Sequence, residues 1–155
     1  MAGPKYAKYI ITDTKPMSPE AILKMQAMRK KTGSTVKSTR LLWLDDEIAK
    51  GAFYMDYLWL WQGRSGGSTE LPHAHDFDEV LGFVGTNRAD PHDLGGEIEL
   101  WLEDEKYILK SSCLVFVPRG LKHCPLQFNR IDSPIFFFTI GTAGKYGRSS
   151  EDKMD

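Results

Sequence analysis

The sequence predicts an all-β protein in which short strands form a sandwich or a closed barrel, with one α-helix near the N-terminus. Two observations predict this fold. From about residue 40 to residue 141, short segments rich in branched and aromatic residues alternate with turn residues. Before residue 40, one segment carries helix start and stop signals. The expected organisation is an N-terminal arm and helix over residues 1–39, the barrel over residues 40–141, and a flexible tail over residues 142–155.

The helix is predicted over about residues 19–31. Ser18 and Pro19 are the residue types preferred at an N-cap and at a first helical position. Gly33 is the expected C-terminal stop. An apolar strip at helical spacing is expected to form a packing surface: Ala21, Met25 and Met28.

The strands are predicted from their aromatic and β-branched residues, which suit a pleated and half-buried surface. Glycine, proline and acidic turns separate them. A barrel of about eight such strands can hold one small ligand in its interior. The expected strands are, in order, residues 40–44, 52–62, 73–84, 97–102, 106–109, 111–118, 123–128 and 133–141.

The charge of the chain is divided between two regions. The formal net charge is −1, which gives no electrostatic case for nucleic-acid binding. Residues 1–40 hold nine Lys/Arg and two Asp/Glu, a net charge of +7, and the remaining residues hold eleven and nineteen, a net charge of −8. A basic arm therefore precedes an acidic body, and it either lies on that body or crosses to a partner subunit. A homodimer is expected.

The sequence favours a cytoplasmic protein without a membrane segment. Cys113 and Cys124 are the only cysteines, and the N-terminal residues lack an apolar signal core, which favours a reducing compartment. No apolar run approaches the roughly 20 residues that a membrane helix needs.

Two stretches carry residues that suit a metal site. His73, His75 and Glu79 have the same strand parity, so they are expected on one face of an extended chain. His123 follows a Pro-x-Gly turn and can add a fourth side chain from another strand. Three imidazoles and one carboxylate suit Fe(II), Mn(II), Ni(II), Co(II) or Zn(II).

Both stretches resemble the two sequence motifs of the cupin superfamily. The first motif is Gly, five residues, His-x-His, three or four residues, Glu, six residues, Gly. The second is Gly, five residues, Pro-x-Gly, two residues, His, three residues, Asn. The matching residues are Gly67, His73, His75, Glu79, Pro118, Gly120 and His123; the departures are Gly85, which is one residue early, Ser112 in place of Gly, and Gln127 in place of Asn.

The resemblance covers about residues 40–141 and implies a cupin-type antiparallel β-barrel, a jelly roll, preceded by the N-terminal α-helix. It also implies that this barrel binds one divalent transition metal through His73, His75, Glu79 and His123. It implies a metal-dependent enzyme acting on a small oxygen-bearing molecule, as an isomerase, lyase, decarboxylase or Fe(II) dioxygenase. The alternative is a cupin that binds or senses a small ligand without turnover. No catalytic residue beyond the metal set is predicted.

Aromatic side chains supply the expected pocket wall, since small-ligand pockets are mostly apolar with a few polar groups. The sequence leaves open which parity of each strand faces the metal. Cys124 directly follows His123 and is expected to face the opposite way. The pocket candidates are Tyr57, Trp59, Trp61, Phe116, Gln127, Phe136 and Phe138.

Overall fold

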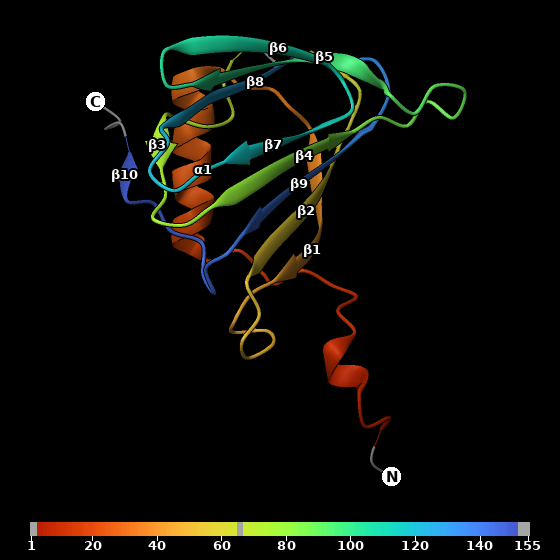
Figure 1. The fold of residues 1–155 in the computed structure, drawn as a ribbon, viewed down its shortest axis with the longest axis vertical. Coiled ribbons are helices and arrows are strands. Elements are labelled where there is room, and N and C mark those ends of the chain that lie inside the picture. The colour runs from red at the N-terminus through yellow and green to blue at the C-terminus, as the bar shows by residue number, and fades with distance from the viewer. Residues whose placement is uncertain (1–2, 65–66, 152–155) are drawn as a thin grey trace.

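Two antiparallel five-stranded sheets face each other in the structure, a computed structural model that describes residues 3–64 and 67–151 (Figure 1). Sheet I has the order β1 (Ser38–Leu44), β2 (Tyr54–Leu60), β9 (Ile135–Gly141), β4 (Glu79–Val84) and β7 (Cys113–Val117). Sheet II has the order β10 (Ser150–Glu151), β3 (His73–Ala74), β8 (His123–Ile131), β5 (Asp93–Leu102) and β6 (Glu105–Ser111).

Over residues 3–64 and 67–151 the fold is all-β with one α-helix, as the sequence predicts, and its architecture is that of a jelly roll. The strands form two separate sheets rather than one closed barrel. The chain crosses repeatedly between the two sheets, so strands distant in sequence become neighbours in each of them. In sheet I β2 pairs with β9, and in sheet II β3 pairs with β8.

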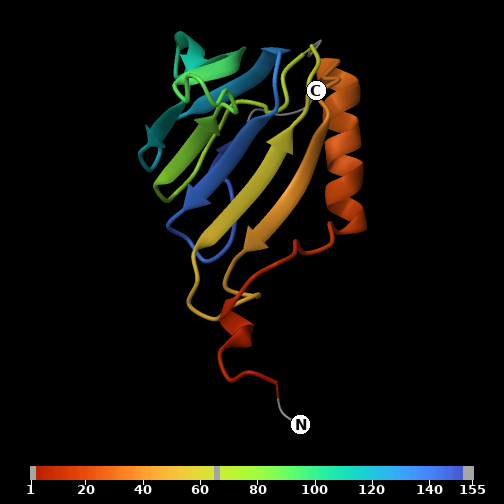
Figure 2. The same cartoon turned by 90° about the vertical axis from the view of Figure 1, so that its right-hand side faces the viewer.

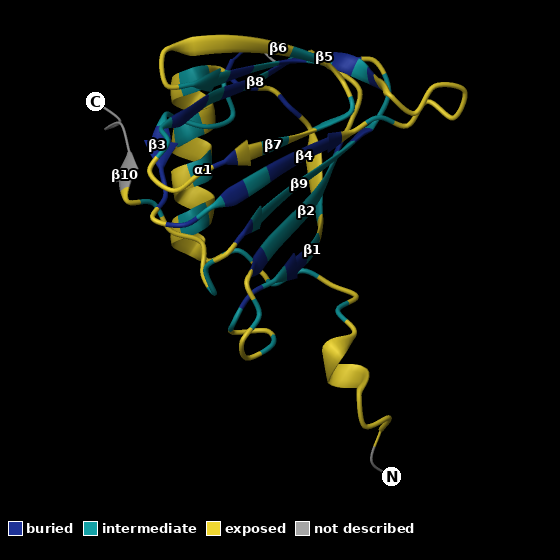
Figure 3. Cartoon of the chain, in the orientation of Figure 1, coloured by how far each residue is buried: buried dark blue, intermediate teal, exposed yellow. Residues whose placement is uncertain are grey.

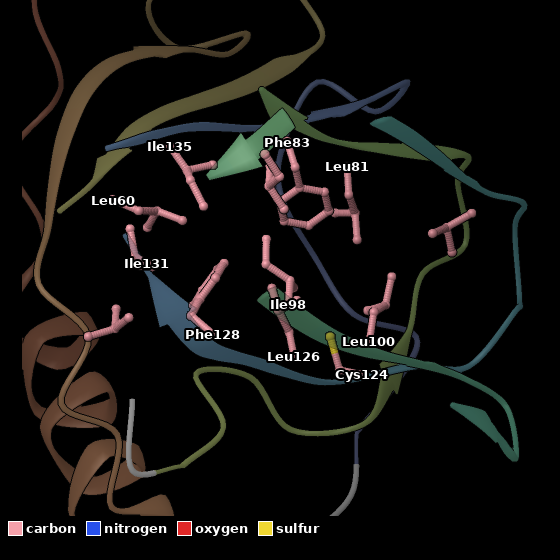
Figure 4. Packing of buried hydrophobic residues seen from close by; sticks show 13 residues of the cluster. Leu60, Leu81, Phe83, Ile98, Leu100, Cys124, Leu126, Phe128, Ile131 and Ile135 are labelled. Atoms are coloured by element: carbon pink, nitrogen blue, oxygen red, sulfur yellow. The ribbon is translucent and has the colours of Figure 1, made fainter. Parts of the chain in front are cut away.

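The hydrophobic core lies between the two sheets, where their inward side chains meet (Figure 4). Leu81 and Phe83 come from sheet I, and Ile98, Leu126 and Phe128 come from sheet II. All five are at most 3% exposed. Alternate residues of each strand supply this layer, as expected from the strand period of two.

Helix α1 (Pro19–Thr32) has the ends that the sequence predicts. The Ser18 hydroxyl accepts a hydrogen bond from the Ala21 N–H at 3.1 Å, and Gly33 takes a left-handed φ of 72°. No residue of α1 is buried, and most of the helix is exposed (Figure 3). Its half-buried Met25 and Met28 line the cavity between the sheets. At 14 residues, α1 is too short to cross a membrane, and the described chain has no other α-helix.

The N-terminal arm projects away from the body, with a short 3₁₀ helix η1 (Ala7–Tyr9) in it (Figure 1). Tyr6, Tyr9 and Ile10 are between 63% and 71% exposed. The arm returns to the body at Lys15, whose Nζ lies 2.6 Å from Asp45 Oδ2.

Two expected segments differ from the structure. The strand expected over residues 73–84 is divided into β3 and β4, because residues 75–78 bend from one sheet to the other. Part of the segment expected as a flexible tail contacts sheet II: β10 pairs with β3, and the Ser149 N–H donates to the Ala74 carbonyl at 2.9 Å. Residues 152–155 of that tail lie outside the described residues.

Candidate metal centre

Three histidines meet between the sheets at one end of the fold. His73 on β3 is the cross-strand partner of His123 on β8, and His75 follows β3 directly. One ring nitrogen from each of the three residues lies within 4.8 Å of the other two. All three side chains are buried, with residue exposures of 1% to 3%. The strand pairing therefore brings together two stretches that are about fifty residues apart in sequence.

Backbone carbonyl groups fix the orientation of all three imidazoles. His73 Nδ1 lies 2.6 Å from the Leu71 carbonyl oxygen, and His123 Nδ1 lies 3.0 Å from that of Leu121. His75 Nδ1 contacts the carbonyl oxygen of Gly147. A carbonyl oxygen only accepts hydrogen bonds, so each Nδ1 must carry the proton. In a neutral ring, Nε2 is then left with a free lone pair, as metal-ligating histidines require.

The Nε2 atoms of His75 and His123 are buried and have no hydrogen-bond partner among the residues that the structure describes. Glu79 lies between them: its Oε2 is 3.3 Å from His75 Nε2, and its Oε1 is 3.4 Å from His123 Nε2. A buried lone pair with no donor is costly unless something electron-deficient binds it. A divalent metal ion would satisfy both nitrogens and the carboxylate together, so the donor set fits such an ion.

Burial favours the neutral form of His73 and His75. It lowers the pKa of His73 to about 3, and it also lowers the pKa of His75, although the charge of Glu79 acts in the opposite direction on His75. Neutral imidazole is the form that ligates metal. The site therefore needs no deprotonation of His73 at neutral pH before an ion binds.

Tyr54 contacts the candidate ligand Glu79, and this contact was not expected from the sequence. Its hydroxyl donates a hydrogen bond to Glu79 Oε2, and the residue is fully buried. Burial, and next the charge of Glu79, raise the pKa of Tyr54 far above its usual value, so the phenol stays a donor. The parity of β2 could have suggested it, since Tyr54 alternates with the outward aromatic residues of that strand.

The Pro-x-Gly turn of the second motif is attached to the first motif by backbone contacts. The Gly120 N–H donates to the His75 carbonyl at 2.8 Å, and the Arg119 N–H donates to Asp78 Oδ1 at 2.8 Å. Gly120 has a φ of 80°, a conformation that favours glycine. Asp78 therefore positions the turn rather than a ligand imidazole.

Two of the three departures from the motifs, Gly85 and Ser112, meet in space. The Ser112 hydroxyl accepts a hydrogen bond from the Gly85 N–H at 2.9 Å and donates to the Pro91 carbonyl at 2.8 Å. A side chain at Gly85 would collide with the Asp93 carbonyl oxygen, at 2.0 Å. Ser112 therefore links the loop at Pro91 to the backbone of Gly85. Position 85 has space only for glycine.

The segment after β9, which was expected as a flexible tail, contributes side chains and a backbone carbonyl to the site. Besides the Gly147 carbonyl, Tyr146 packs edge-on against His75, with ring centroids 5.3 Å apart. Arg148 Nη2 lies 2.5 Å from Glu70 Oε2, and Arg148 Nε donates to the Tyr146 hydroxyl at 2.9 Å. The composition of this segment is small and polar, so its sequence gave no packing signal.

A cavity of about 270 Å³ lies beside the histidines. Its wall is apolar where Leu60, Leu126 and Phe137 line it, and charged where Arg40 and Asp56 line it. The guanidinium of Arg40 donates to both carboxylate oxygens of Asp56 at 2.8 Å, from Nε and from Nη2. The cavity therefore presents both apolar surface and fixed charge to a small molecule.

The predicted pocket lining is wrong, because the opposite parity of β2, β8 and β9 faces the cavity and no residue of β7 lines it. On β2 the residues that line it are even-numbered, from Tyr54 to Leu60, and on β9 they include Phe137. A strand period of two then turns the predicted aromatic residues outward. None of the seven predicted residues lines the cavity: Tyr57, Trp59, Trp61, Phe116, Gln127, Phe136 and Phe138.

Cys124 is also placed differently from the expectation. It lines the same cavity as His123 rather than facing away from it. Its φ of 74° and the register shift of β8 against β5 break the strand alternation at this point. The residue is 4% exposed, and burial raises the pKa of its thiol well above the usual value. Within the described residues both cysteines are free.

Comparisons with known proteins give structural likenesses only. No family model and no curated protein matches the sequence. The structure aligns with oxalate oxidase in complex with glycolate at 18% identity and a TM-score of 0.47, covering 76% of this chain and 55% of that chain, so the alignment spans about half of the oxalate oxidase. It aligns with the polyketide cyclase RemF from Streptomyces resistomycificus at 18% and 0.47, covering 80% and 75%. It aligns with KdgF from Halomonas sp. at 15% and 0.41, covering 72% and 80%.

The fold assignment rests on the chain's own strand order and contacts. Antiparallel pairing sets His73 against His123, and the Pro-x-Gly turn donates to the His75 carbonyl. The two stretches that resemble cupin motifs therefore meet at a single point between two jelly-roll sheets. The protein has the cupin fold.

Proposed function

We propose that the protein is a cytoplasmic, metal-dependent enzyme that acts on a small oxygen-bearing organic molecule. Its metal ligands would be His73, His75, Glu79 and His123. The observation that carries this proposal is the pair of buried Nε2 atoms on His75 and His123. They face one carboxylate and have no hydrogen-bond partner in the described part of the chain. An ordinary packed core does not leave such atoms unsatisfied.

Three neutral imidazoles and one carboxylate suit Fe(II), Mn(II), Ni(II), Co(II) or Zn(II). When bound, the ion would supply Lewis-acid chemistry, or a site for both substrate and oxygen, at its remaining open positions. The chain's own groups would hold the ligands in place. Tyr54 donates to Glu79, and the carbonyl oxygens of Leu71, Leu121 and Gly147 orient the imidazoles.

The cavity favours a compact substrate. Its volume of about 270 Å³ is near the lower end for small-molecule sites. Arg40 and Asp56 on one wall can select polar groups, and the apolar wall excludes water from the rest of the molecule. An isomerase, lyase, decarboxylase or dioxygenase reaction on a molecule with two neighbouring oxygen atoms is consistent with these features.

The first test is metal content. The full-length protein, purified without chelator, oxygen or affinity metal, is expected to hold about one equivalent of a transition metal by mass spectrometry. His75→Ala and His123→Ala should lose it. His92→Ala is the matched control, because His92 lies on an exposed loop. A wild type that neither contains nor binds a metal on titration would refute the proposal, as would equal metal content in all variants.

The second test separates an enzyme from a non-catalytic ligand-binding protein. A metal-loaded wild type is screened for turnover of dicarbonyls, hydroxyketones and oxo acids, with and without oxygen. Turnover that disappears in His75→Ala and persists in His92→Ala would support the enzyme. Ligand-induced thermal stabilisation without turnover would identify a binding or sensing protein instead.

A further inference from the structure

The outward face of sheet I is apolar across all five strands. In an antiparallel sheet that covers a core on one side, outward residues are ordinarily polar. Here the inward residues alternate with an outward set in which β1, β2, β9, β4 and β7 place no charged side chain. Six of the seven residues that the sequence predicts for the pocket lie on this face. No helix of the described chain crosses it (Figure 2).

The centre of this face is an aromatic cluster on β2 and β9. Tyr57 is the cross-strand partner of Phe138, and Trp59 is the partner of Phe136. The ring centroid of Tyr57 lies 5.5 Å from that of Phe136 and 5.6 Å from that of Phe138. The ring centroids of Trp59 and Phe136 are 5.4 Å apart. Tyrosine, tryptophan and phenylalanine are enriched at the centres of protein interfaces, because they bury a large area at little cost in side-chain entropy.

The apolar face continues onto β4 and β7. Phe138 lies over Gly82 on β4: a Cβ there would come within 2.1 Å of the Phe138 ring. On β7, Leu114 is 68% exposed and Phe116 is 61% exposed. Contiguous apolar patches larger than a few hundred square ångströms are rare on monomeric proteins. This face therefore has the character of an interface rather than of a solvated surface.

We propose that a second copy of this chain covers this face through a two-fold symmetric, sheet-to-sheet contact. Strands lie about 4.8 Å apart and rise about 3.4 Å per residue, so five strands with six residues each span roughly 24 by 20 Å. Two such faces together remove on the order of 1,000 Å² in projection alone, which is the area that a specific interface requires. An apolar face is best covered by another apolar face, because a charged partner would lose its hydration. In a two-fold symmetric contact, the same apolar face of each copy forms the two sides of the interface.

The N-terminal arm gives an independent argument for a second copy. Tyr6, Tyr9 and Ile10 are exposed on an arm that extends beyond the body (Figure 1). Residues 3–17 of this arm hold three lysines and one aspartate, a net charge of +2, whereas residues 41–155 carry a net charge of −8. The arm of one copy is thus complementary in charge to the body of another.

The test is the mass of the full-length protein in solution, measured by light scattering over a dilution series. Leu114→Lys and Phe116→Lys should leave the single chain folded, because both side chains are exposed in it. In the dimer, each would bury an unpaired ammonium group. Ile108→Lys is the matched control, because Ile108 is 44% exposed on β6 of the other sheet. Far-UV circular dichroism and metal content verify that each variant is folded.

The wild type is expected at twice the chain mass of 17.6 kDa. Leu114→Lys and Phe116→Lys should raise the dissociation constant at least about a hundredfold, and Ile108→Lys should not change it. A monomeric wild type would overturn the proposal, as would a Leu114→Lys dimer as tight as the wild type or an equal effect of Ile108→Lys.

Oxidative footprinting of the wild type tests the face without any variant. Trp61 and Phe116 should react much more slowly than Tyr107, although all three are at least 39% exposed in the single chain. Comparable labelling of Phe116 and Tyr107, corrected for their intrinsic reactivities, would also overturn the proposal.

Discussion

Replacing Tyr54 by phenylalanine tests whether the candidate metal centre depends on a buried phenol. The substitution removes one hydroxyl and keeps the ring, whose edge-on contacts with Phe77 and Tyr146 have centroid distances of 5.6 and 5.4 Å. The lost interaction is the hydrogen bond to Glu79 Oε2. In the metal-free protein this carboxylate otherwise faces the Nε2 lone pairs of His75 and His123. The variant therefore leaves a buried carboxylate without its donor.

The expected loss follows from burial. Tyr54 is 0% exposed and Glu79 is 3% exposed, so water does not replace the donor. Leaving a buried charged acceptor unsatisfied costs about 2–3 kcal/mol. For a chain of this length, that loss lowers Tm by about 4–12 °C. The measurement is urea unfolding of the metal-free protein, followed by circular dichroism at neutral pH.

Tyr107→Phe is the matched control. The Tyr107 hydroxyl also donates to a carboxylate, that of Glu105, but both residues are exposed. Its loss should change stability by less than about 0.5 kcal/mol. If Tyr54→Phe unfolded at the same urea concentration as Tyr107→Phe, the reasoning that burial makes this hydrogen bond important would be wrong.

Two further predictions concern pH and packing. The metal-free protein should lose stability as pH falls below 6.5, because burial lowers the pKa of folded His73 to about 3 while the unfolded chain takes up the proton near its ordinary pKa. Between pH 6.5 and pH 5 this residue should lower the free energy of unfolding by about 2 kcal/mol. His73→Gln should make the urea midpoint depend less steeply on pH. An unchanged pH dependence in this variant would contradict the lowered pKa of His73. Gly82→Ala should destabilise the protein by about 1–3 kcal/mol, because the new methyl group would collide with the Phe138 ring. Gly3→Ala, which meets nothing within 4 Å, is its control, and equal unfolding midpoints would refute the contact.

Local sequence signals were sufficient for the helix and for most strands. The cap at Ser18 and the stop at Gly33 act within one helical turn, so neighbouring residues alone determine them. Most strands could likewise be predicted from neighbouring residues, because a strand is recognised by its aromatic and β-branched composition and by a hydrophobic period of two. The spacing of His73, His75 and Glu79, with His123 after its turn, also predicted which residues the structure gathers at one place.

Tertiary structure alone decided which face of each strand lines the cavity. A period of two gives two equivalent parities, and only the opposing sheet determines which of them is buried. The aromatic residues of β2 and β9 therefore lie outside, while Tyr54 lies beside Glu79. The Gly147 carbonyl reaches His75 through a contact between residues 72 positions apart, which no local pattern encodes. The sequence by itself determines features that depend on a few neighbouring residues, such as helix caps and ligand spacing. Contacts between distant segments determine which face of each strand is buried and which groups hydrogen-bond to the candidate ligands.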